Sequence, residues 1–304
     1  MTSHATATEL VRHCPAKVNL ALSVGPPRAD RLHPIASWMV ALTFGDQLTL
    51  RRTNQPDSTW RIAFADDAPV PQPIDWPLER DLAYRAHRLL ADHVGQPLTV
   101  DADLCKRIPA GAGLGGGSSD AAATLVGLND LFNLNLTAND LTPLAATLGS
   151  DVAFLVAAML GSPSAIVTGV GEHITPAPQP APIDLVLILP PFTCPTGPVY
   201  AAFDEQHPHD AALRSNDVQA LPTQHPLPPD APFNDLAAPA CQVQPQLAEA
   251  IANLTDMLDQ PVHVTGSGAA MFIIAHTPTH ARDLAATLTR STPLAPVATQ
   301  TLPQ

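Results

Sequence analysis

A glycine-rich stretch, PAGAGLGGGSSD at residues 109–120, has the residue types that bind a phosphate group. Five of its twelve residues are glycine. Glycine lets an anion approach the backbone N–H groups and adopts φ/ψ values that a side chain disfavours. Ser118 and Ser119 follow, where they could cap a helix, donate to a phosphate or ligate Mg²⁺. The alternative, a flexible turn before a capped helix, seldom needs so many glycines.

Two familiar phosphate-binding loops are excluded. No Gly-Lys-Ser/Thr ends the stretch, so it is not a P-loop. Gly111, Gly113 and Gly116 satisfy G-x-G-x-x-G, but a dinucleotide-binding fold also needs an acidic residue after the second strand, about 20 residues on. The nearest acidic residue, Asp140, lies in a segment with a helical pattern. The context therefore excludes a Rossmann site.

Lysine is rare in this chain, and its two occurrences are candidates for chemistry. Of the 15 basic residues only Lys17 and Lys106 are lysine. Lysine carries a compact charge with a tunable pKa, which arginine does not offer. Lys17 lies in an apolar segment, and a buried lysine is costly unless a carboxylate or phosphate is close by. We predict a chemical role for Lys17, whereas Lys106, just ahead of the glycine stretch, has either such a role or a chance placement.

Asp151 is the candidate carboxylate. It follows a break at Gly149-Ser150 and opens the almost wholly apolar segment VAFLVAAML. One interpretation is an N-cap or a partner for the helix dipole. The other is a catalytic carboxylate held at a cleft.

The elements that must position these residues follow from the spacing of apolar residues. Residues 98–105 alternate as a strand does, and residues 121–132 have helical spacing, so the glycine stretch joins a strand to a helix. Residues 10–24 form an apolar strand with Lys17 and Asn19 on one face. Further elements are a loop at 25–33, strands on both sides of a turn at Gly45-Asp46, a helix within 78–95, a strand and tight turn at 164–176, a strand at 183–192, a surface loop at 207–232, strands joined by Gly266-Ser267-Gly268, a helix at 278–290 and a disordered tail.

Composition narrows the class of protein. The chain has 304 residues, 45% hydrophobic and 14% charged, which is enough for one large or two ordinary domains with apolar cores. The net charge of −13 argues against nucleic acid and anionic membranes as partners. The four cysteines form no C-x-x-C pair, so neither a metal site nor a disulfide framework is indicated. No apolar signal segment is evident, and we expect a soluble, cytosolic protein.

Four motifs in order give the chain a family resemblance. PAKVNL (15–20), the glycine stretch with its following alanines, GSDVAF (149–154) and TGSGAAMF (265–272) match signature motifs of the GHMP small-molecule kinases. Residues 168–172 and 234–236 make the chain most similar to the branch that phosphorylates a cytidyl diphospho-polyol. The resemblance spans roughly residues 17–272, most of the chain.

The resemblance implies a fold and a reaction. The fold is α+β with two domains: an N-terminal domain with the glycine loop, residues 1–178, and a ferredoxin-like C-terminal α/β-plait domain, residues 179–304. The reaction is transfer of the γ-phosphoryl group of ATP to a substrate hydroxyl, with Mg²⁺ as cofactor. Its implied ATP-binding residues are Pro109, Ala110, Gly111, Ala112, Gly113, Leu114, Gly115, Gly116, Gly117, Ser118 and Ser119.

The resemblance also implies roles for residues outside the loop. Lys17 and Asp151 are the catalytic pair: Asp151 accepts the hydroxyl proton, and Lys17 keeps it ionised and neutralises charge on the transferring phosphoryl group. Asn19, His33 and Tyr200 lie at substrate-side positions. No residue is assigned as a metal ligand. The other positive charge comes from Mg²⁺, from helix ends and, if it is available, from Lys106.

Three departures from the family pattern leave alternatives open. Leu32 stands where the family has a tyrosine that stacks on cytosine, so Tyr200 would be the one matching aromatic residue. Ala153 replaces a proline beside Asp151, and residues 207–232 have no counterpart. The alternatives are another GHMP kinase, acting on mevalonate, homoserine or a sugar, and a catalytically silent relative that binds nucleotide. The oligomeric state does not follow from the sequence.

Overall fold

The computed structural model describes residues 8–179, 181–207 and 212–304. The chain divides into two compact units. Unit 1 contains residues up to 16 with 45–108 and 115–160, and unit 2 contains residues 17–44, 109–114 and 161–304. The fold is α+β with two sheets, as predicted. The domain boundary between residues 178 and 179 stays a prediction.

Unit 1 joins part of a sheet to a group of helices. Its strands are β3 (Thr59–Phe64), β4 (Val100–Lys106), the second part of β2 (Ile35–Arg52) and the first part of β1 (Glu9–Val24), in that order. β4 pairs antiparallel with β2 and parallel with β3. The helical elements are the short η1 (Leu78–Arg80), α1 (Leu82–Val94), α2 (Gly116–Phe132), α3 (Ala138–Ala146) and α4 (Ser150–Met159).

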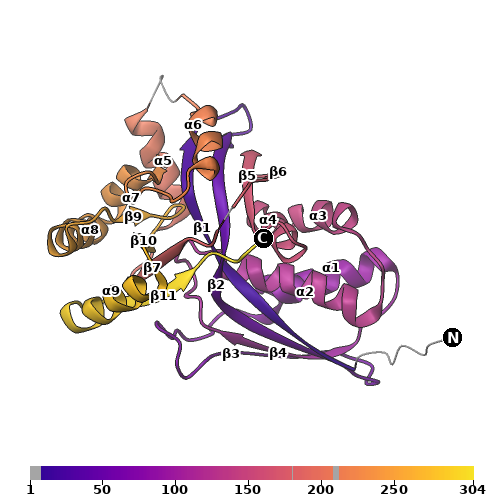
Figure 1. Cartoon of the computed structure of the whole chain (residues 1–304). Helices are drawn as coiled ribbons and strands as arrows, with labels where there is room; N and C mark the ends of the chain where they lie inside the picture. The colour runs from indigo at the N-terminus through magenta and orange to yellow at the C-terminus, as the bar shows by residue number, and fades with distance from the viewer. Residues whose placement is uncertain (1–7, 180, 208–211) are drawn as a thin grey trace. The chain divides into compact units, whose positions relative to one another are not determined.

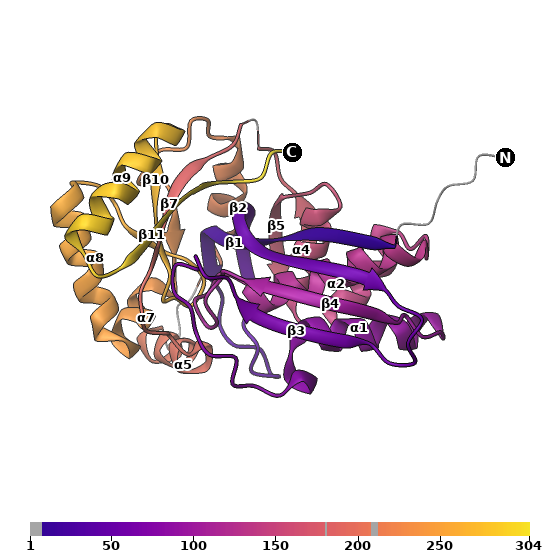
Figure 2. The same cartoon turned by 90° about the horizontal axis from the view of Figure 1, so that it is seen from below.

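Helix α2 is the centre of unit 1. It packs against α1, α3 and α4, and Figures 1 and 2 show it running beside α1. Its alanine and leucine side chains are buried over most of its length, because neighbouring helices cover several of its faces.

Local signals fix the ends of α1: Asp81 Oδ1 accepts a hydrogen bond from Ala83 N at 2.9 Å, and Gly95 ends the helix in the left-handed region.

Unit 2 contains two groups of strands. In the first, β5 (Ser164–Gly169) pairs antiparallel with β2 and with β6 (His173–Pro176), and β1 pairs parallel with β8 (Phe233–Asn234). The second is a sheet in the order β11-β7-β10-β9, antiparallel throughout. Its strands are β7 (Asp184–Leu189), β9 (His263–Val264), β10 (Met271–Ala275) and β11 (Ala295–Gln300).

The second sheet and its helices confirm the ferredoxin-like prediction. Helices lie between β7 and β9, and α9 (Pro278–Ser291) lies between β10 and β11 and packs on β7, β10 and β11 (Figure 1). A split βαβ unit of this kind is the ferredoxin-like arrangement. The helical elements between β7 and β9 are α5 (Thr196–Gln206), α6 (Ser215–Ala220), η2 (Leu221–Thr223), α7 (Ala237–Val243) and α8 (Pro245–Leu258). The core they share includes Val186, Ile188, Phe203, Leu247, Ile273 and Leu288.

Three predictions about individual elements are wrong. No turn forms at Gly45-Asp46, because β2 runs unbroken from residue 35 to 52. A Cβ atom at Gly45 would lie 2.2 Å from the Cys14 carbonyl oxygen, so this glycine allows a close approach of β1. The tail is not disordered, since β11 pairs with β7 along its length. The stretch 207–232 is not all loop, because it contains α6 and η2; residues 208–211 lie outside the described part.

In the described part of the chain, no helix has the length and apolar character needed to cross a membrane.

Candidate active site

The glycine loop connects the end of β4 to the start of α2, as predicted. Gly111, Gly113 and Gly115 have φ angles of 71°, 81° and 69°, in the left-handed region that favours glycine. Gly115 is the N-cap of α2, and no side chain caps that end of the helix. The backbone therefore presents the first turn of α2, with its partial positive charge, to the loop. This is an arrangement that can bind a phosphate group.

Helix α2 begins five residues earlier than the apolar spacing indicates. Gly116, Gly117, Ser118 and Ser119 form its first turn instead of preceding it. Neither serine caps the helix, contrary to one of the expected roles. The Ser119 side chain is fully buried and its hydroxyl has no hydrogen-bond partner among the described residues, whereas Ser118 is partly exposed. Of the two serines, Ser118 is therefore the more accessible to a ligand.

The second glycine turn packs against the first part of the loop, within unit 2. It joins β9 to β10 as a hairpin, and Ala270 N donates a hydrogen bond to Ala112 O at 3.0 Å. A Cβ atom at Gly113 would lie 2.9 Å from the carbonyl oxygens of both Thr265 and Gly268. The turn is therefore more than a plain hairpin, because it forms the surface on which the loop rests.

Asn234 holds this second turn in place. Its Nδ2 donates to Val264 O and Gly266 O, both at 2.8 Å, and its Oδ1 accepts from Leu236 N at 2.9 Å. All polar atoms of the Asn234 side chain are thus used to fix the backbone. The sequence pointed to this residue only as part of a family motif and gave no reason for it.

Lys17 and Asn19 share one face of β1, as the two-residue spacing predicts. Lys17 Nζ donates to Asn19 Oδ1 at 2.8 Å, and Asn19 Nδ2 donates to Ser37 Oγ at 2.8 Å. Asn19 N donates to Thr265 Oγ1 at 2.9 Å, and Lys17 N donates to Leu114 O at 2.9 Å. Lys17 therefore lies beside both glycine segments of unit 2, and its ammonium group is oriented by an amide that is itself held on two sides.

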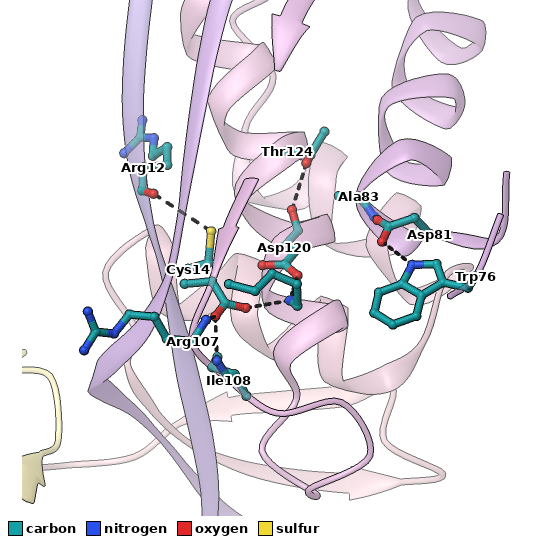
Figure 3. A network of polar contacts seen from close by, with 11 residues as sticks. Arg12, Cys14, Trp76, Asp81, Ala83, Arg107, Ile108, Asp120 and Thr124 are labelled. Atoms are coloured by element: carbon teal, nitrogen blue, oxygen red, sulfur yellow. Dashed lines mark hydrogen bonds and ion pairs between the residues drawn. The ribbon is translucent and has the colours of Figure 1, made fainter. Parts of the chain in front are cut away.

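Lys106 has a structural environment. Its Nζ donates to Asp46 Oδ2 at 2.7 Å and forms a second ion pair with Asp120, and all three side chains are buried. Asp46 Oδ1 also accepts a hydrogen bond from Ile108 N at 2.7 Å and another from Arg107 N. Figure 3 shows Asp120, Arg107 and Ile108 in this network. The expectation that Lys106 supplies charge to a phosphate is therefore wrong.

The charges of this cluster alter the pKa values of its members. Burial raises the pKa of the Asp120 carboxyl well above its usual range; Lys106 opposes this shift, and Asp46 adds to it. Burial alone would lower the pKa of Lys106, but the two carboxylates outweigh it, and the pKa is raised. The sequence missed Asp46 and Asp120; the available signals were an aspartate inside an apolar strand and the aspartate that ends the glycine motif.

Asp151 lies in the first turn of α4, within unit 1. The N-cap of this helix is Gly149, so the interpretation of Asp151 as an N-cap is wrong. A carboxylate in a first turn is favoured by the helix dipole. The roles of Lys17 and Asp151 as a catalytic pair stay a prediction.

His33 and Tyr200 are neighbours in unit 2. Their ring centroids are 5.0 Å apart with a tilt of 43°. His33 Nδ1 lies 2.9 Å from Gly25 O, and its Nε2 lies 3.5 Å from an Asp204 oxygen. The structure thus brings together two of the three predicted substrate-side residues, whereas the third, Asn19, contacts Lys17. Leu32, which replaces an expected aromatic residue, is 51% exposed in the same loop as His33.

Magnesium would have few ligands from the chain. Within residues 8–179, 181–207 and 212–304, no three His, Cys, Asp or Glu side chains cluster closely enough to hold a metal ion. Mg²⁺ in phosphoryl-transfer sites keeps several waters and is bound largely through substrate phosphates, with one or two protein ligands. The donor set here, with Ser118 at the end of the loop, fits that mode of binding.

Comparisons with known proteins identify the family. Residues 81–167 match the family described as the GHMP kinases N terminal domain. A 4-diphosphocytidyl-2-C-methyl-D-erythritol kinase of Deinococcus radiodurans is 37% identical over 281 residues, which are 92% of this chain and 88% of the relative. The crystal structure of a 4-(cytidine 5'-diphospho)-2C-methyl-D-erythritol kinase has a TM-score of 0.77 and 34% identity, and covers 97% of this chain and 100% of that chain.

A more distant structure shares the fold alone. The crystal structure of L. major mevalonate kinase in complex with R-mevalonate has a TM-score of 0.70 at 14% identity, with 98% of each chain covered. The near-full-length relatives above 30% identity decide the family. The chain belongs to the 4-diphosphocytidyl-2-C-methyl-D-erythritol kinase family of the GHMP kinases.

Proposed function

We propose that this protein transfers the γ-phosphoryl group of ATP to the 2-hydroxyl group of 4-diphosphocytidyl-2-C-methyl-D-erythritol, a step in the non-mevalonate route to isoprenoid precursors. The observation that carries the proposal is the identity of 34–37% with kinases of this name over nearly the whole length of the chain. The glycine loop supplies the matching chemistry, because its left-handed glycines and uncapped helix end suit a polyphosphate.

The loop binds and orients ATP. Side chains at Gly111, Gly113 and Gly115 would be strained, so the backbone stays open to the phosphates. The helix end of α2 stabilises negative charge on the phosphates, and its electrostatic effect is greatest where water is excluded. Bound Mg²⁺ would supply further positive charge to the β- and γ-phosphates. Ser118 is the residue that we propose as its ligand from the protein.

Lys17 and Asp151 act on the attacking hydroxyl group of the substrate and on the phosphoryl group that it receives. Asp151 accepts the proton of the attacking hydroxyl, and Lys17 stabilises the charge that develops on the transferring phosphoryl group. For Asn19 we add a positioning role to the substrate-side position predicted for it. Its amide oxygen accepts a hydrogen bond from the Lys17 ammonium, and Ser37 Oγ and Thr265 Oγ1 contact the same amide and fix it, so Asn19 acts through Lys17.

The cytidine end of the substrate belongs beside His33 and Tyr200. The contacts of His33 with Gly25 and Asp204 hold its ring against Tyr200. An aromatic ring and a fixed imidazole are groups that bind a pyrimidine by stacking and hydrogen bonding. Leu32 provides apolar contact and no ring.

We propose the cytosol as the location of the protein, because ATP is available there.

Leu32 is also the observation that favours a second candidate, another GHMP kinase with a smaller alcohol substrate. The test is ATP turnover by the purified protein against 4-diphosphocytidyl-2-C-methyl-D-erythritol, mevalonate, homoserine and galactose, with ³¹P NMR of the products. We expect kcat/KM for the cytidyl alcohol to exceed the others by at least about 10²-fold, because buried polar groups of the site would be unpaired with the smaller alcohols.

Two results decide between the candidates. Preferred turnover of a smaller alcohol would replace the proposed substrate while keeping the kinase reaction. ATP binding without turnover of any alcohol would instead identify a silent relative. The control is Asp151→Asn, which should lower kcat by about 10²–10⁴ and leave ATP binding intact.

A further inference from the structure

The two ends of the glycine loop meet in unit 1. Residues 106–108 lead into the loop and residues 115–120 lead out of it, and both segments belong to this unit. A Cβ atom at Gly116 would lie 2.9 Å from Ile108 Cγ2 and 3.1 Å from Ile108 Cβ. The backbone at Gly116 is therefore in close contact with Ile108, and the residues that flank the loop on its two sides lie next to each other.

A buried ionic cluster joins these two flanking segments. Asp46 accepts hydrogen bonds from the backbone of Arg107 and Ile108, on the first side of the loop. Lys106, on the same side, forms ion pairs with Asp46 and with Asp120, which lies in α2 on the second side. These contacts tie both sides of the loop to each other and to β2.

The chemistry of the cluster points to a role beyond stability. Removing three charged groups from water is costly, and apolar side chains of similar volume often stabilise a protein as well or better. One ammonium and two carboxylates also leave an excess of negative charge, and Asp120 Oδ1 has no hydrogen-bond partner in the described part of the chain. Charged hydrogen bonds fix the direction and the separation of the groups that they join, whereas apolar packing does not.

We propose that Lys106, Asp46 and Asp120 form a clamp that fixes the separation of the two ends of the glycine loop and thereby positions the loop for ATP. The three are positioning residues, since they act through the backbone of the loop. This proposal rests on the proposed function for its link to ATP. Its structural part, a loop held in shape by the clamp before ATP binds, can be measured without ATP.

The first test compares variants of one residue. Asp120→Ala removes the second side of the clamp, and Asp120→Asn keeps an acceptor for Lys106. Leu125→Ala, also buried in α2, is the control for lost stability, and Asp130→Ala, which breaks the ion pair with Arg12 at the other end of α2, is the control for lost charge. The readouts on the full chain are the Kd for ATP by calorimetry, the KM of the alcohol, and hydrogen exchange of amides 110–117 without ligand.

We expect Asp120→Ala to raise the Kd for ATP by about 10- to 100-fold, since a small displacement of positioning groups has effects of that size. The KM of the alcohol should stay within about threefold, and loop amides should exchange faster than in the wild-type protein. Asp120→Asn and both controls should bind ATP within about threefold of the wild-type protein.

If Asp120→Ala does not fold, the triple variant Asp46→Asn/Lys106→Met/Asp120→Leu takes its place, because an apolar replacement of a buried ionic cluster is commonly tolerated. It should be folded, with faster loop exchange and weaker ATP binding. Wild-type loop exchange and ATP affinity in Asp120→Ala, or in the triple variant that replaces it, would overturn the proposal, as would an equal loss in Leu125→Ala. A wild-type protein that does not bind ATP would overturn the proposed function instead, while loop exchange would still decide whether the clamp exists.

Discussion

The two lysines of this chain are buried to the same degree but lie in different surroundings. Lys17 and Lys106 are 5% and 4% exposed. In unit 1 the Lys106 ammonium lies between the carboxylates of Asp46 and Asp120. In unit 2 the Lys17 ammonium donates to the neutral amide oxygen of Asn19, beside the second glycine turn.

From this difference we infer a structural use for the charge of Lys106, while Lys17 stays the lysine predicted to act in the chemistry. Two carboxylates more than compensate the charge of Lys106 inside the protein. Lys17 donates a hydrogen bond to an amide oxygen, which orients its ammonium group. Burial and residue type are alike for the two lysines and do not distinguish them, whereas the groups beside them differ. The catalytic role of Lys17 stays a prediction.

The largest expected effect is on stability. Lys106→Met leaves two carboxylates buried without their ammonium partner, and we expect it to lower the free energy of unfolding by about 3–5 kcal/mol. Urea denaturation measures this. Adding Asp120→Asn should recover part of the loss, because one of the two charges is then gone. A Lys106→Met protein as stable as the wild type would contradict the structural role of Lys106.

The next effect concerns the glycine loop beside Lys17. Gly113→Ala puts a Cβ atom 2.9 Å from two carbonyl oxygens at a φ of 81°. The left-handed conformation costs about 1–2 kcal/mol, and the overpacking adds about 1–3 kcal/mol. We expect lower stability and weaker ATP binding, measured by denaturation and calorimetry. Gly117→Ala, in the first turn of α2 with no contact under 3.5 Å, is the control for stability and should leave the free energy of unfolding nearly unchanged.

A third prediction extends the chemistry of unit 2 to the substrate. Tyr200→Ala should raise the KM of the cytidyl alcohol roughly five- to 150-fold, because base–aromatic stacking contributes about 1–3 kcal/mol. Leu32→Tyr should lower that KM with little change in kcat. The KM of ATP should change in neither variant. Steady-state kinetics with each substrate varied in turn gives the answer, and an unchanged KM of the cytidyl alcohol in both variants would remove the substrate assignment.

The smallest expected effect is a pH dependence of stability, caused by Asp120 in unit 1. The pKa of Asp120 is raised in the folded protein, chiefly by burial, so the folded state binds this proton more tightly than the unfolded state. Stability contributed by the bound proton is present at low pH and is lost as the pH rises from the unfolded value, about 3.9, through the folded pKa. As the pH rises above about 4, the Tm of the wild type should therefore fall relative to that of Asp120→Asn. A difference in Tm that does not change with pH would show that folding does not raise the pKa of Asp120.

Much of the site was predictable because its signals are local. Left-handed glycines, the strand before the loop and the helix after it follow from consecutive residues. The pairing of Lys17 with Asn19 follows from the period of a strand. The ferredoxin-like unit and the kinase family followed from motifs that were compared in order along the chain.

What was missed depends on partners far away in the sequence. Gly45 looks like a turn residue until β1 is placed against it, and Asp46 gains its role from Lys106, 60 residues further on. Strand β11 contains Pro296, which is tolerated because β11 is at the edge of its sheet. These residues form a strand because they pair with β7, more than 100 residues earlier in the chain. No local pattern carries such information.

The most direct test of the account is kcat of Lys17→Met with ATP and 4-diphosphocytidyl-2-C-methyl-D-erythritol, measured on a preparation whose Tm is also recorded. We predict that kcat falls by about 10²–10³, as for the loss of one group that stabilises the transition state, while Tm falls far less than in Lys106→Met. A Lys17→Met protein that keeps kcat within about threefold of the wild type would contradict the account, because the charge placed for chemistry would then not be at Lys17.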